Sequence, residues 1–284
     1  MNALTGLGNS SSDDQPLRED GFTITLDGAE VTAYPGETLW KIAKRAGEMI
    51  PHLCYSEAPD YRGDGNCRAC MVEIDGERTL AASCIREARA GMVVRSASSR
   101  RAGEARAMVV ELLAADMPAE AHNPDVSSHF MAMAELLAVD VGHARETLGG
   151  ARETVREWLG ETVDEWLPTQ ASALDHSHTA MAVNHDACIS CGLCVRACRE
   201  VQVNDVIGLA GRGSNTRIVF DLEDPMGDST CVACGECVQA CPTGALMPAA
   251  QVDEQGFGDS AAVDERVASI CPYCGVGCQL EYQV

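Results

Sequence analysis

Eight cysteines between residues 188 and 241 constrain this chain more than any other feature. They form two blocks, CISCGLCVRAC and CVACGECVQAC, and each block has the spacing C-x2-C-x2-C-x3-C. Three thiolates on such a tight loop can reach one compact centre, whereas a fourth thiolate on the following helix points away from it. Closely clustered cysteines of this kind favour metal binding over disulfides. This part of the chain is therefore expected to fold around metal–thiolate centres.

The doubled spacing, with Pro242 directly after the second block, resembles that of two-cluster bacterial ferredoxins, which hold two [4Fe–4S] clusters. Each cluster then takes three ligands from one block and its fourth from the other. The predicted ligand sets are Cys188, Cys191, Cys194 and Cys241 for one cluster, and Cys231, Cys234, Cys237 and Cys198 for the second. Gly192 and Gly235 are expected to relieve the backbone where it wraps each cluster. Two zinc sites are the alternative, although this doubled spacing is not usual for zinc.

Composition narrows the setting of these centres. The chain has 284 residues and 15 cysteines, which suits about two domains or several small modules. Cluster assembly needs reduced thiols, so we expect a cytoplasmic protein. The 21 Lys and Arg face 43 Asp and Glu, and a net charge of −22 argues against a nucleic-acid partner. No apolar run is long enough to predict a membrane span, and residues 1–20 are expected to be a disordered tail, not a signal peptide.

The first folded module is expected over residues 21–97. FTITLDGAEVTAY alternates apolar and polar residues around an Asp-Gly pair at 27–28, which predicts a β-hairpin with a type I′ turn. Thr38 is the predicted N-cap of a helix that ends before Gly47. MVEIDGERTLAAS predicts a second hairpin that turns at residues 75–76.

Four cysteines lie in this module at intervals of x12, x2 and x13. They are Cys54, Cys67, Cys70 and Cys84. Hairpin, helix, cysteine loop and hairpin together predict a β-grasp ferredoxin that holds a [2Fe–2S] cluster on these four thiolates. Gly63 and Gly65 are expected to let backbone N–H groups approach the sulfides. A structural zinc site is the alternative, because four cysteines alone suit either metal.

The cysteine intervals, and the run GNCRACMVEI at residues 65–74, resemble the N-terminal domain of the large redox subunit of respiratory complex I and its relatives. Those relatives carry a further [4Fe–4S] site, with one His followed by Cys at four, seven and thirteen residues. Counted from His122, these positions hold Val126, His129 and Glu135, and residues 85–187 contain no cysteine. Residues 98–175 are therefore expected to be a helical spacer without that cluster. Another metal on His122, His129 and Glu135 is an open but weaker alternative to surface or packing roles.

Two amphipathic helices are predicted within the spacer. The first, RRAGEARAMVVELLAAD, has its apolar face through Val109, Leu112 and Leu113, and the second is ARETVREWLGETVDEWLP. His176, His178 and His185, which precede the first cysteine block, are interpreted as loop residues and not as ligands. Between the blocks, Val219, Phe220 and Leu222 predict a short strand pair.

Two runs around the cysteine blocks, RACREVQVNDVIG and DPMGDSTCVACGECVQACPTGAL, are similar to α subunits of soluble NAD-dependent formate dehydrogenases. Near the C-terminus, SICPYCGVGC supplies Cys271, Cys274 and Cys278. This motif resembles the opening of molybdopterin-dependent oxidoreductases, whose first domain holds one [4Fe–4S] cluster. These three cysteines would supply three of its four ligands and therefore predict an incomplete third [4Fe–4S] site. A zinc knuckle or a cysteine-rich tail is the alternative.

Together the modules resemble the N-terminal part of the α subunit of a cytoplasmic NAD-dependent molybdenum or tungsten formate dehydrogenase. The resemblance implies an α+β chain in which the β-grasp module and the spacer are followed by three parts. These are a double [4Fe–4S] ferredoxin domain at 176–250, a linker at 251–268, and the truncated start of a molybdopterin domain at 269–284.

The resemblance also implies an electron relay. Formate would be oxidised at a Mo or W bis-molybdopterin guanine dinucleotide centre, and electrons would pass through the clusters to a flavin subunit that reduces NAD. The molybdopterin, FMN and NAD are expected on a further domain and on partner subunits, among them a small [2Fe–2S] subunit. No catalytic residue is assigned to this chain.

Two other functions are open. The first is a redox subunit of an NADH dehydrogenase or of an NAD-reducing hydrogenase. The hydrogenase subunit would not need CPYCGVGC, and complex I would more naturally retain the middle cluster. The second is a non-catalytic zinc or iron–sulfur redox sensor, which visible absorption and iron content would distinguish from a relay.

Overall fold

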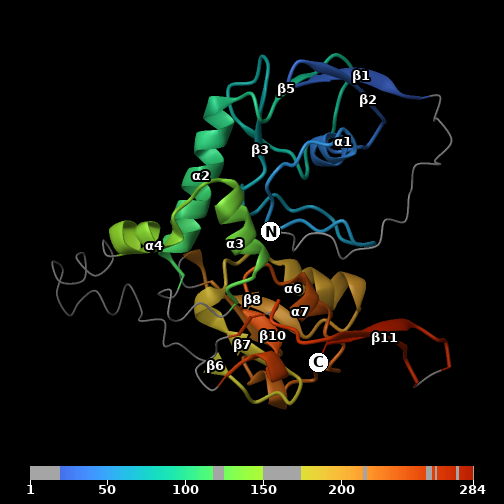
Figure 1. Cartoon of the computed structure of the whole chain (residues 1–284), viewed down its shortest axis with the longest axis vertical. Helices are drawn as coiled ribbons and strands as arrows, with labels where there is room; N and C mark the ends of the chain where they lie inside the picture. Colours follow the sequence, from blue (N-terminus) through green and yellow to red (C-terminus); the bar gives the residue numbers. More distant parts are fainter. Residues whose placement is uncertain are drawn as a thin grey trace.

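A computed structural model of the chain describes residues 20–117, 125–149, 174–213, 216–253, 258–259, 261–272 and 275–283. Figure 1 shows the β-grasp module at one end of the molecule and the ferredoxin-like module at the other, with helices along one side. The predicted tail lies outside the described residues except for Asp20, and the second predicted spacer helix lies entirely outside them. Within the described part, every helix is too short or too polar to span a bilayer.

The β-grasp module is built on a five-stranded sheet in the order β2-β1-β5-β3-β4. Its strands are β1 (Phe22–Leu26), β2 (Ala29–Ala33), β3 (Met71–Ile74), β4 (Ala81–Ala82) and β5 (Val93–Arg95). The first predicted hairpin is confirmed, since β1 and β2 pair antiparallel and both turn residues have positive φ, 48° at Asp27 and 90° at Gly28. The predicted helix is α1 (Leu39–Arg45), and Thr38 Oγ1 accepts a hydrogen bond from Lys41 N–H at its start.

The second predicted hairpin is present but shorter than expected. Only Met71 and Val72 of β3 pair with β4, while Glu73 and Ile74 pair with β5. Strand β5, which the sequence analysis did not predict, lies in the middle of the sheet, parallel to β1 and antiparallel to β3. The apolar core is therefore closed by this strand and by α1.

The described part of the spacer is helical, with α2 (Arg100–Ala115), α3 (His129–Leu136), α4 (Val141–Ala144) and the π-helical turn η2 (Arg145–Gly149). The predicted helix is confirmed as α2, but its predicted apolar face was wrong in part, since of its three residues only Leu113 packs against the buried cluster around Val110. Its buried residues are Ala102, Arg106, Val110 and Ala114, whereas Leu112 is 54% exposed and Val109 and Leu113 are half-buried. Small alanines let the helix approach the β-grasp module closely, and Arg106 is buried because its guanidinium donates to the Ser96 carbonyl at 2.7 Å.

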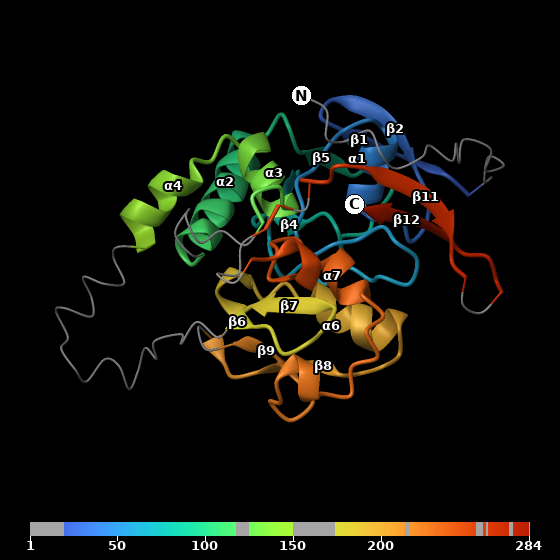
Figure 2. The ribbon, with the colours of Figure 1, turned by 60° about the horizontal axis from the view of Figure 1, so that its bottom comes forward.

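The ferredoxin-like module contains a three-stranded sheet, β10-β7-β6, and the hairpin β8-β9. The strand bounds are β6 (Leu174–Asp175), β7 (Met181–Asn184), β8 (Ile207–Ala210), β9 (Arg217–Phe220) and β10 (Leu246–Pro248). The helices are α6 (Leu193–Arg196), continued by the π-helical turn η5 (Ala197–Val201), and α7 (Glu236–Ala240), with 3-10 turns η4 (His185–Ala187), η7 (Met226–Asp228) and η8 (Ala249–Gln251). Figure 2 shows α6 and α7 beside the strands. The predicted strand pair between the cysteine blocks is confirmed as β8-β9, although Leu222 lies beyond it and is exposed.

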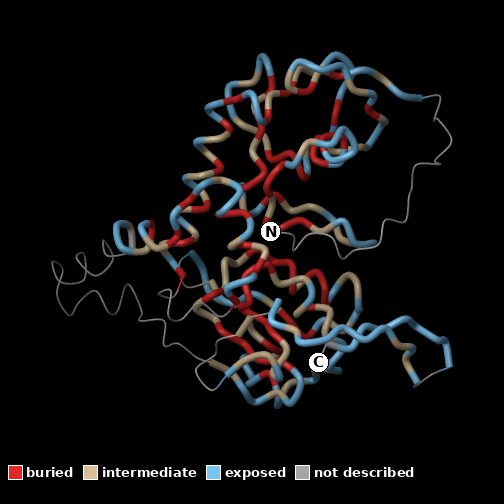
Figure 3. Tube along the Cα trace, viewed as in Figure 1, coloured by how far each residue is buried: buried red, intermediate tan, exposed pale blue. Residues whose placement is uncertain are grey.

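The C-terminal segment is a two-stranded hairpin, β11 (Arg266–Ile270) with β12 (Gln279–Gln283). Figure 3 shows it as an arm of largely exposed residues. Its large apolar side chains, Val267, Ile270, Val276, Leu280 and Tyr282, are all exposed. The hairpin therefore contributes little to either apolar core.

Candidate metal centres

The first cysteine site lies where the loops of the β-grasp module meet. Cys54, Cys70 and Cys84 are buried, and Cys67 is half-buried. The Cys54 thiol is in hydrogen-bonding contact with Cys67 and Cys84, and Cys70 is in contact with Cys84. All four predicted [2Fe–2S] ligands are thus gathered at one point, and their ligation itself stays a prediction.

The proximity of these thiols shifts their pKa values in opposite directions. Hydrogen bonds from the Cys67 and Cys84 side chains lower the pKa of Cys54. The pKa of Cys84 rises because its thiol donates to Cys54 and Cys70. Four thiolates this close would repel one another in a buried site, so full deprotonation requires a cationic partner. The donor set therefore fits an iron–sulfur cluster.

Two glycines shape the loop that covers this site. A Cβ at Gly63 would lie 2.6 Å from the Cys84 carbonyl oxygen, and Gly65, with φ of 65°, would place one 2.8 Å from the Ile85 side chain. A side chain at either position would push the loop away from Cys84. Held close, the loop directs the Cys67 N–H to the Cys54 sulfur at 3.4 Å. N–H groups that donate to ligand sulfurs help to set the potential of a cluster.

Cysteines from both blocks line a small cavity in the ferredoxin-like module. Its sulfur-bearing residues are Cys188, Cys191, Cys194 and Cys241. Burial raises the pKa of Cys188 to about 11, and burial together with Cys241 raises that of Cys191. Ser190 N–H donates to the Cys188 sulfur at 3.4 Å.

A second small cavity in this module is likewise lined by cysteines from both blocks. Its cysteines are Cys198, Cys231, Cys234 and Cys237. Val206 N–H donates to the Cys198 sulfur at 3.3 Å, and burial with the neighbouring Cys234 raises the pKa of Cys237 to about 12. Cys234 is exposed. Each cavity thus combines three cysteines of one block with the fourth of the other, which is the grouping that crossed ligation requires.

The loops around both cavities depend on left-handed glycines. Gly192 has φ of 74° and precedes α6, and Gly235 has φ of 77° and precedes α7. Side chains other than glycine are strained at such angles. These two positions allow each cysteine loop to turn directly into the helix that carries the fourth cysteine.

The histidines of the middle segment do not form a metal site in the described residues. His129 Nε2 lies 2.8 Å from the His52 carbonyl oxygen and its ring packs on the His52 ring, whereas Glu135 is exposed and His122 falls outside the described residues. Across the described ranges, no group of three or more His, Cys, Asp or Glu is placed to hold a single metal ion. His129 instead packs beside the Cys54 loop, a role that no sequence pattern indicated.

The C-terminal cysteines have a different environment. The Cys271 N–H donates to the Cys278 carbonyl oxygen at 2.8 Å, at the end of the hairpin where the strands enter the connecting loop. Cys271 is half-buried and Cys278 is exposed, while Cys274 lies outside the described residues. In the described residues, Cys271 and Cys278 are therefore joined by this backbone hydrogen bond at the end of the hairpin strands. The third [4Fe–4S] site stays a prediction.

Sequence reasoning missed the direct contact between the two cluster modules. Cys54 packs with Cys191 and Leu193 in one apolar group. The Tyr61 hydroxyl donates to a Glu236 carboxylate oxygen at 3.0 Å. A buried arginine on α6, Arg196, also crosses this boundary. The one signal of this contact in the sequence was Arg196 itself, a charged residue between the third and fourth cysteines of the first block.

Comparisons with known proteins match this order of modules. Residues 19–99 match the 2Fe-2S iron-sulfur cluster binding domain, residues 187–245 the 4Fe-4S dicluster domain, and residues 264–284 the molybdopterin oxidoreductase Fe4S4 domain. The predicted fold class is therefore confirmed: a [2Fe–2S] ferredoxin domain is followed by a double [4Fe–4S] domain and by the start of a molybdopterin oxidoreductase domain.

Curated relatives include two kinds of oxidoreductase. One relative belongs to the NADH-quinone oxidoreductase of Rhizobium meliloti and is 30% identical over 258 residues, which are 90% of this chain and 27% of the relative. Putative formate dehydrogenase YrhE of Bacillus subtilis is 26% identical over an alignment of 296 positions, which covers 92% of this chain and 28% of that protein. The chain thus spans little more than a quarter of these relatives.

One solved structure has a similar fold at a comparable level of identity. It is titled "Crystal structure of NAD+-reducing [NiFe]-hydrogenase in the H2-reduced state". The match has a TM-score of 0.64 and 28% identity, and it covers 80% of this chain and 87% of the other. All three relatives are oxidoreductases, and two are named as acting on NAD or NADH.

Proposed function

We propose that this chain, an iron–sulfur electron-transfer segment of an oxidoreductase, serves a cytoplasmic NAD-dependent formate dehydrogenase. It carries electrons from a molybdenum or tungsten pterin site, where formate is oxidised, toward a subunit that holds flavin and reduces NAD. A small [2Fe–2S] subunit accompanies the flavin subunit as a further partner. The observation that carries the proposal is the match of residues 264–284 to the molybdopterin oxidoreductase Fe4S4 domain, directly after the two cluster modules.

The residues of this chain bind, bury and orient the redox centres. When bound, iron–sulfur clusters supply one-electron transfer without bond cleavage. The β-grasp and ferredoxin-like modules together form the body of the molecule. Their twelve cysteines, in three sites, would hold one [2Fe–2S] and two [4Fe–4S] clusters, as assigned from their spacing. Burial of Cys54 and Cys194, and N–H donors to the sulfurs, exclude water and adjust the potentials.

The second candidate function is a redox subunit of an NADH dehydrogenase or of an NAD-reducing hydrogenase. The hydrogenase likeness favours it, because the match covers 87% of that solved chain. The motif CPYCGVGC argues for formate dehydrogenase, as it has no evident use in a hydrogenase subunit. Activity assays of the assembled complex separate these candidates, since only one is reduced by formate.

The relay is tested first by metal content. The full chain, purified anaerobically and reconstituted with iron and sulfide, is expected to hold about ten irons, from one [2Fe–2S] and two [4Fe–4S] clusters. EPR of the dithionite-reduced protein should resolve the separate cluster types. Stoichiometric zinc with little iron would contradict the relay and support the metal-binding sensor.

The second test is a dye-reduction assay with formate. The chain without molybdenum or tungsten is expected to accept electrons from dithionite and pass them to an artificial acceptor, yet show no turnover with formate. Formate turnover should appear when the molybdopterin domain is present, and NAD reduction when the flavin subunit is added as well. Formate oxidation by a sample free of both metals would refute the proposal.

A further inference from the structure

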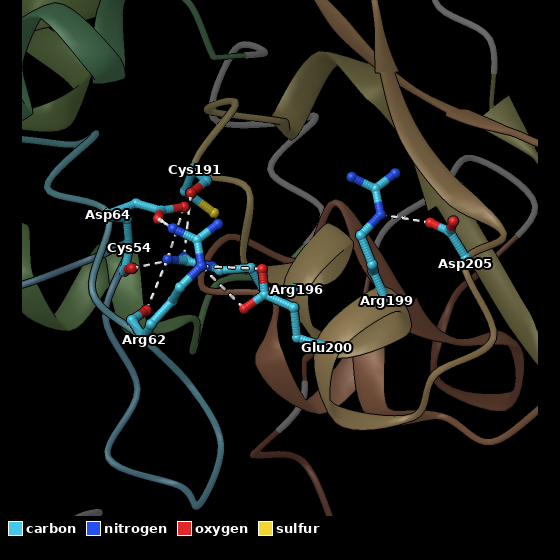
Figure 4. Close-up of polar contacts among 8 residues, drawn as sticks. All are labelled: Cys54, Arg62, Asp64, Cys191, Arg196, Arg199, Glu200 and Asp205. Carbon is cyan, nitrogen blue, oxygen red and sulfur yellow. Dashed lines mark hydrogen bonds and ion pairs between the residues drawn. The ribbon is translucent and has the colours of Figure 1, made fainter.

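A buried arginine joins the two cluster modules. Arg196, the last residue of α6, is 2% exposed. Its Nη1 donates to the Arg62 carbonyl at 2.9 Å and lies 2.9 Å from the Asp64 carboxylate, and both partners belong to the β-grasp module. Figure 4 shows the guanidinium inserted among these groups.

The second terminal nitrogen of Arg196 contacts both cluster sites. Nη2 donates to the carbonyl of Cys54 at 2.8 Å and lies 3.5 Å from the carbonyl of Cys191. Cys54 is a predicted ligand of the [2Fe–2S] cluster, and Cys191 is a predicted ligand of the first [4Fe–4S] cluster. One nitrogen atom thus links the ligand loops of two different centres.

The charge of Arg196 is only partly compensated. Asp64, which also pairs with Arg62, is its carboxylate partner in the described structure, and the buried Nε has no hydrogen-bond partner. A positive charge buried beside cysteine thiolates acts through a low effective dielectric. It stabilises the more negative, reduced state of a neighbouring cluster and so raises the reduction potential.

We propose that Arg196 is a positioning residue for electron transfer between the [2Fe–2S] site and the first [4Fe–4S] site. It holds the Cys54 loop against the Cys191 loop, and its charge raises the reduction potentials of both sites. The inference rests on the proposed relay. In the transfer, one site loses one electron and the other gains it, and no bond or proton changes.

A purely structural role for Arg196 would have a different signature. A packing residue would change the stability of the module boundary but would leave the potentials of intact clusters unchanged. Asn66 and Tyr61 also bridge the boundary, through Cys191 and Glu236, so the modules have contacts that do not involve Arg196. An Arg196 variant can therefore retain the contact between modules while it loses the charge.

The chain offers a matched control on the same helical segment. Arg199 lies three residues further along, is exposed, and pairs with Asp205 (Figure 4). Arg199→Gln and Arg196→Gln remove the same charge from the same segment. Only the second removes it from between the predicted ligands Cys54 and Cys191.

The experiment is an anaerobic redox titration of the reconstituted full chain, followed by EPR. Arg196→Gln is expected to shift the reduction equilibrium of the [2Fe–2S] and first [4Fe–4S] sites at least tenfold toward the oxidised form, or about 59 mV for one electron. The second [4Fe–4S] site should shift less. Arg199→Gln should leave the [2Fe–2S] site and the first [4Fe–4S] site at their wild-type potentials. Arg196→Lys keeps the charge but cannot bridge both carbonyls, so it should weaken the magnetic interaction between the two reduced sites with a smaller shift in potential.

The outcomes separate this inference from the relay itself. Loss of the wild-type cluster signals, or zinc in their place, would refute the relay before any variant is compared. With wild-type clusters present, unchanged potentials in Arg196→Gln would overturn the role of Arg196, as would equal shifts in both Gln variants. If Arg196→Gln fails to assemble clusters, Arg196→Lys decides: a weakened magnetic interaction supports the role, and an unchanged one overturns it.

Discussion

Cys54 and Cys70 have no exposed surface within the β-grasp module, whereas Cys278 is exposed on a two-stranded hairpin. Both regions carry closely spaced cysteines in runs that resemble cluster-binding motifs. In the β-grasp module the thiols meet because strands, α1 and the glycine loop hold them there. In the hairpin, the described contact between Cys271 and Cys278 is a single backbone hydrogen bond.

The difference shows that spacing and preorganisation are separate properties. Spacing decides which thiols can reach one centre, but packing decides how much conformational entropy is lost when they do. The body sites lose most of that entropy when the apolar core forms. A lone two-stranded hairpin is at best marginally stable in water, so it cannot restrain its cysteines in the same way.

The largest expected effect tests this contrast directly. Cys70→Ala is expected to abolish the [2Fe–2S] signal and to lower the iron content by about two, because a buried thiolate ligand has no substitute nearby. Cys278→Ala, the matched change in the hairpin, should leave the [2Fe–2S] and both body [4Fe–4S] signals intact. Iron analysis and EPR measure both. Retention of the [2Fe–2S] cluster in Cys70→Ala would break the comparison.

The second prediction concerns which cysteines share a cluster. Packing decides this, and proximity in sequence does not. Cys198→Ala should lose the same [4Fe–4S] signal as Cys237→Ala, although Cys198 is much closer in sequence to Cys194. Cys241→Ala should match Cys194→Ala instead. The reason is that Cys198 and Cys237 line one cavity while Cys194 and Cys241 line the other. A spectrum of Cys198→Ala that equals that of Cys194→Ala would refute crossed ligation.

Much of the body was predictable because its signals are local. The Asp-Gly turn at residues 27–28 needs positive φ at both positions, and Thr38 satisfies an N–H at the start of α1. The cysteine groups follow from short spacings that a compact cluster imposes. The turn and the helix cap are each decided within a few residues, so one sequence suffices for them.

The features that were missed depend on distant partners. Strand β5 has only three residues and forms because β1 and β3 pair with it on either side. The buried face of α2 includes Arg106, whose position is explained only by the Ser96 carbonyl. Arg196 contacts Cys54 from 142 positions away in sequence. No local pattern contains these contacts.

The third prediction compares the stability of the two regions. Ile24→Ala is expected to lower the free energy of unfolding by about 2–5 kcal/mol, because Ile24 is 1% exposed in the β-grasp core. Ile270→Ala should change it by less than about 0.5 kcal/mol, because this side chain is 63% exposed on β11. Urea unfolding followed by far-UV circular dichroism measures both. A cost at Ile270 equal to that at Ile24 would mean that the hairpin is packed in solution.

The smallest expected effect is a pH dependence of stability that arises from His52 in the β-grasp module. The hairpin cannot show it, because residues 266–284 contain no histidine. His52 packs against Trp40 and His129, and burial, with a smaller effect of the His129 charge, lowers its pKa to about 4. In the unfolded chain its pKa returns to about 6.5. Below that pH the unfolded state binds a proton that the folded state does not, so stability falls as the pH falls.

From these values His52 contributes about 1.5 kcal/mol that is lost between pH 6.5, where the unfolded imidazole is half protonated, and pH 5. His52→Gln removes the titrating group, so its unfolding midpoint should change less between pH 7.5 and pH 5 than that of the wild type. His176→Gln, which changes an exposed side chain, serves as the control and should keep the wild-type slope. Since His129 is buried beside His52 and its pKa is also lowered by burial, some slope should remain in His52→Gln. Parallel pH profiles for the wild type and His52→Gln would show that His52 is not held neutral beside the Cys54 loop. The pH dependence of stability would then no longer distinguish the buried site from the hairpin.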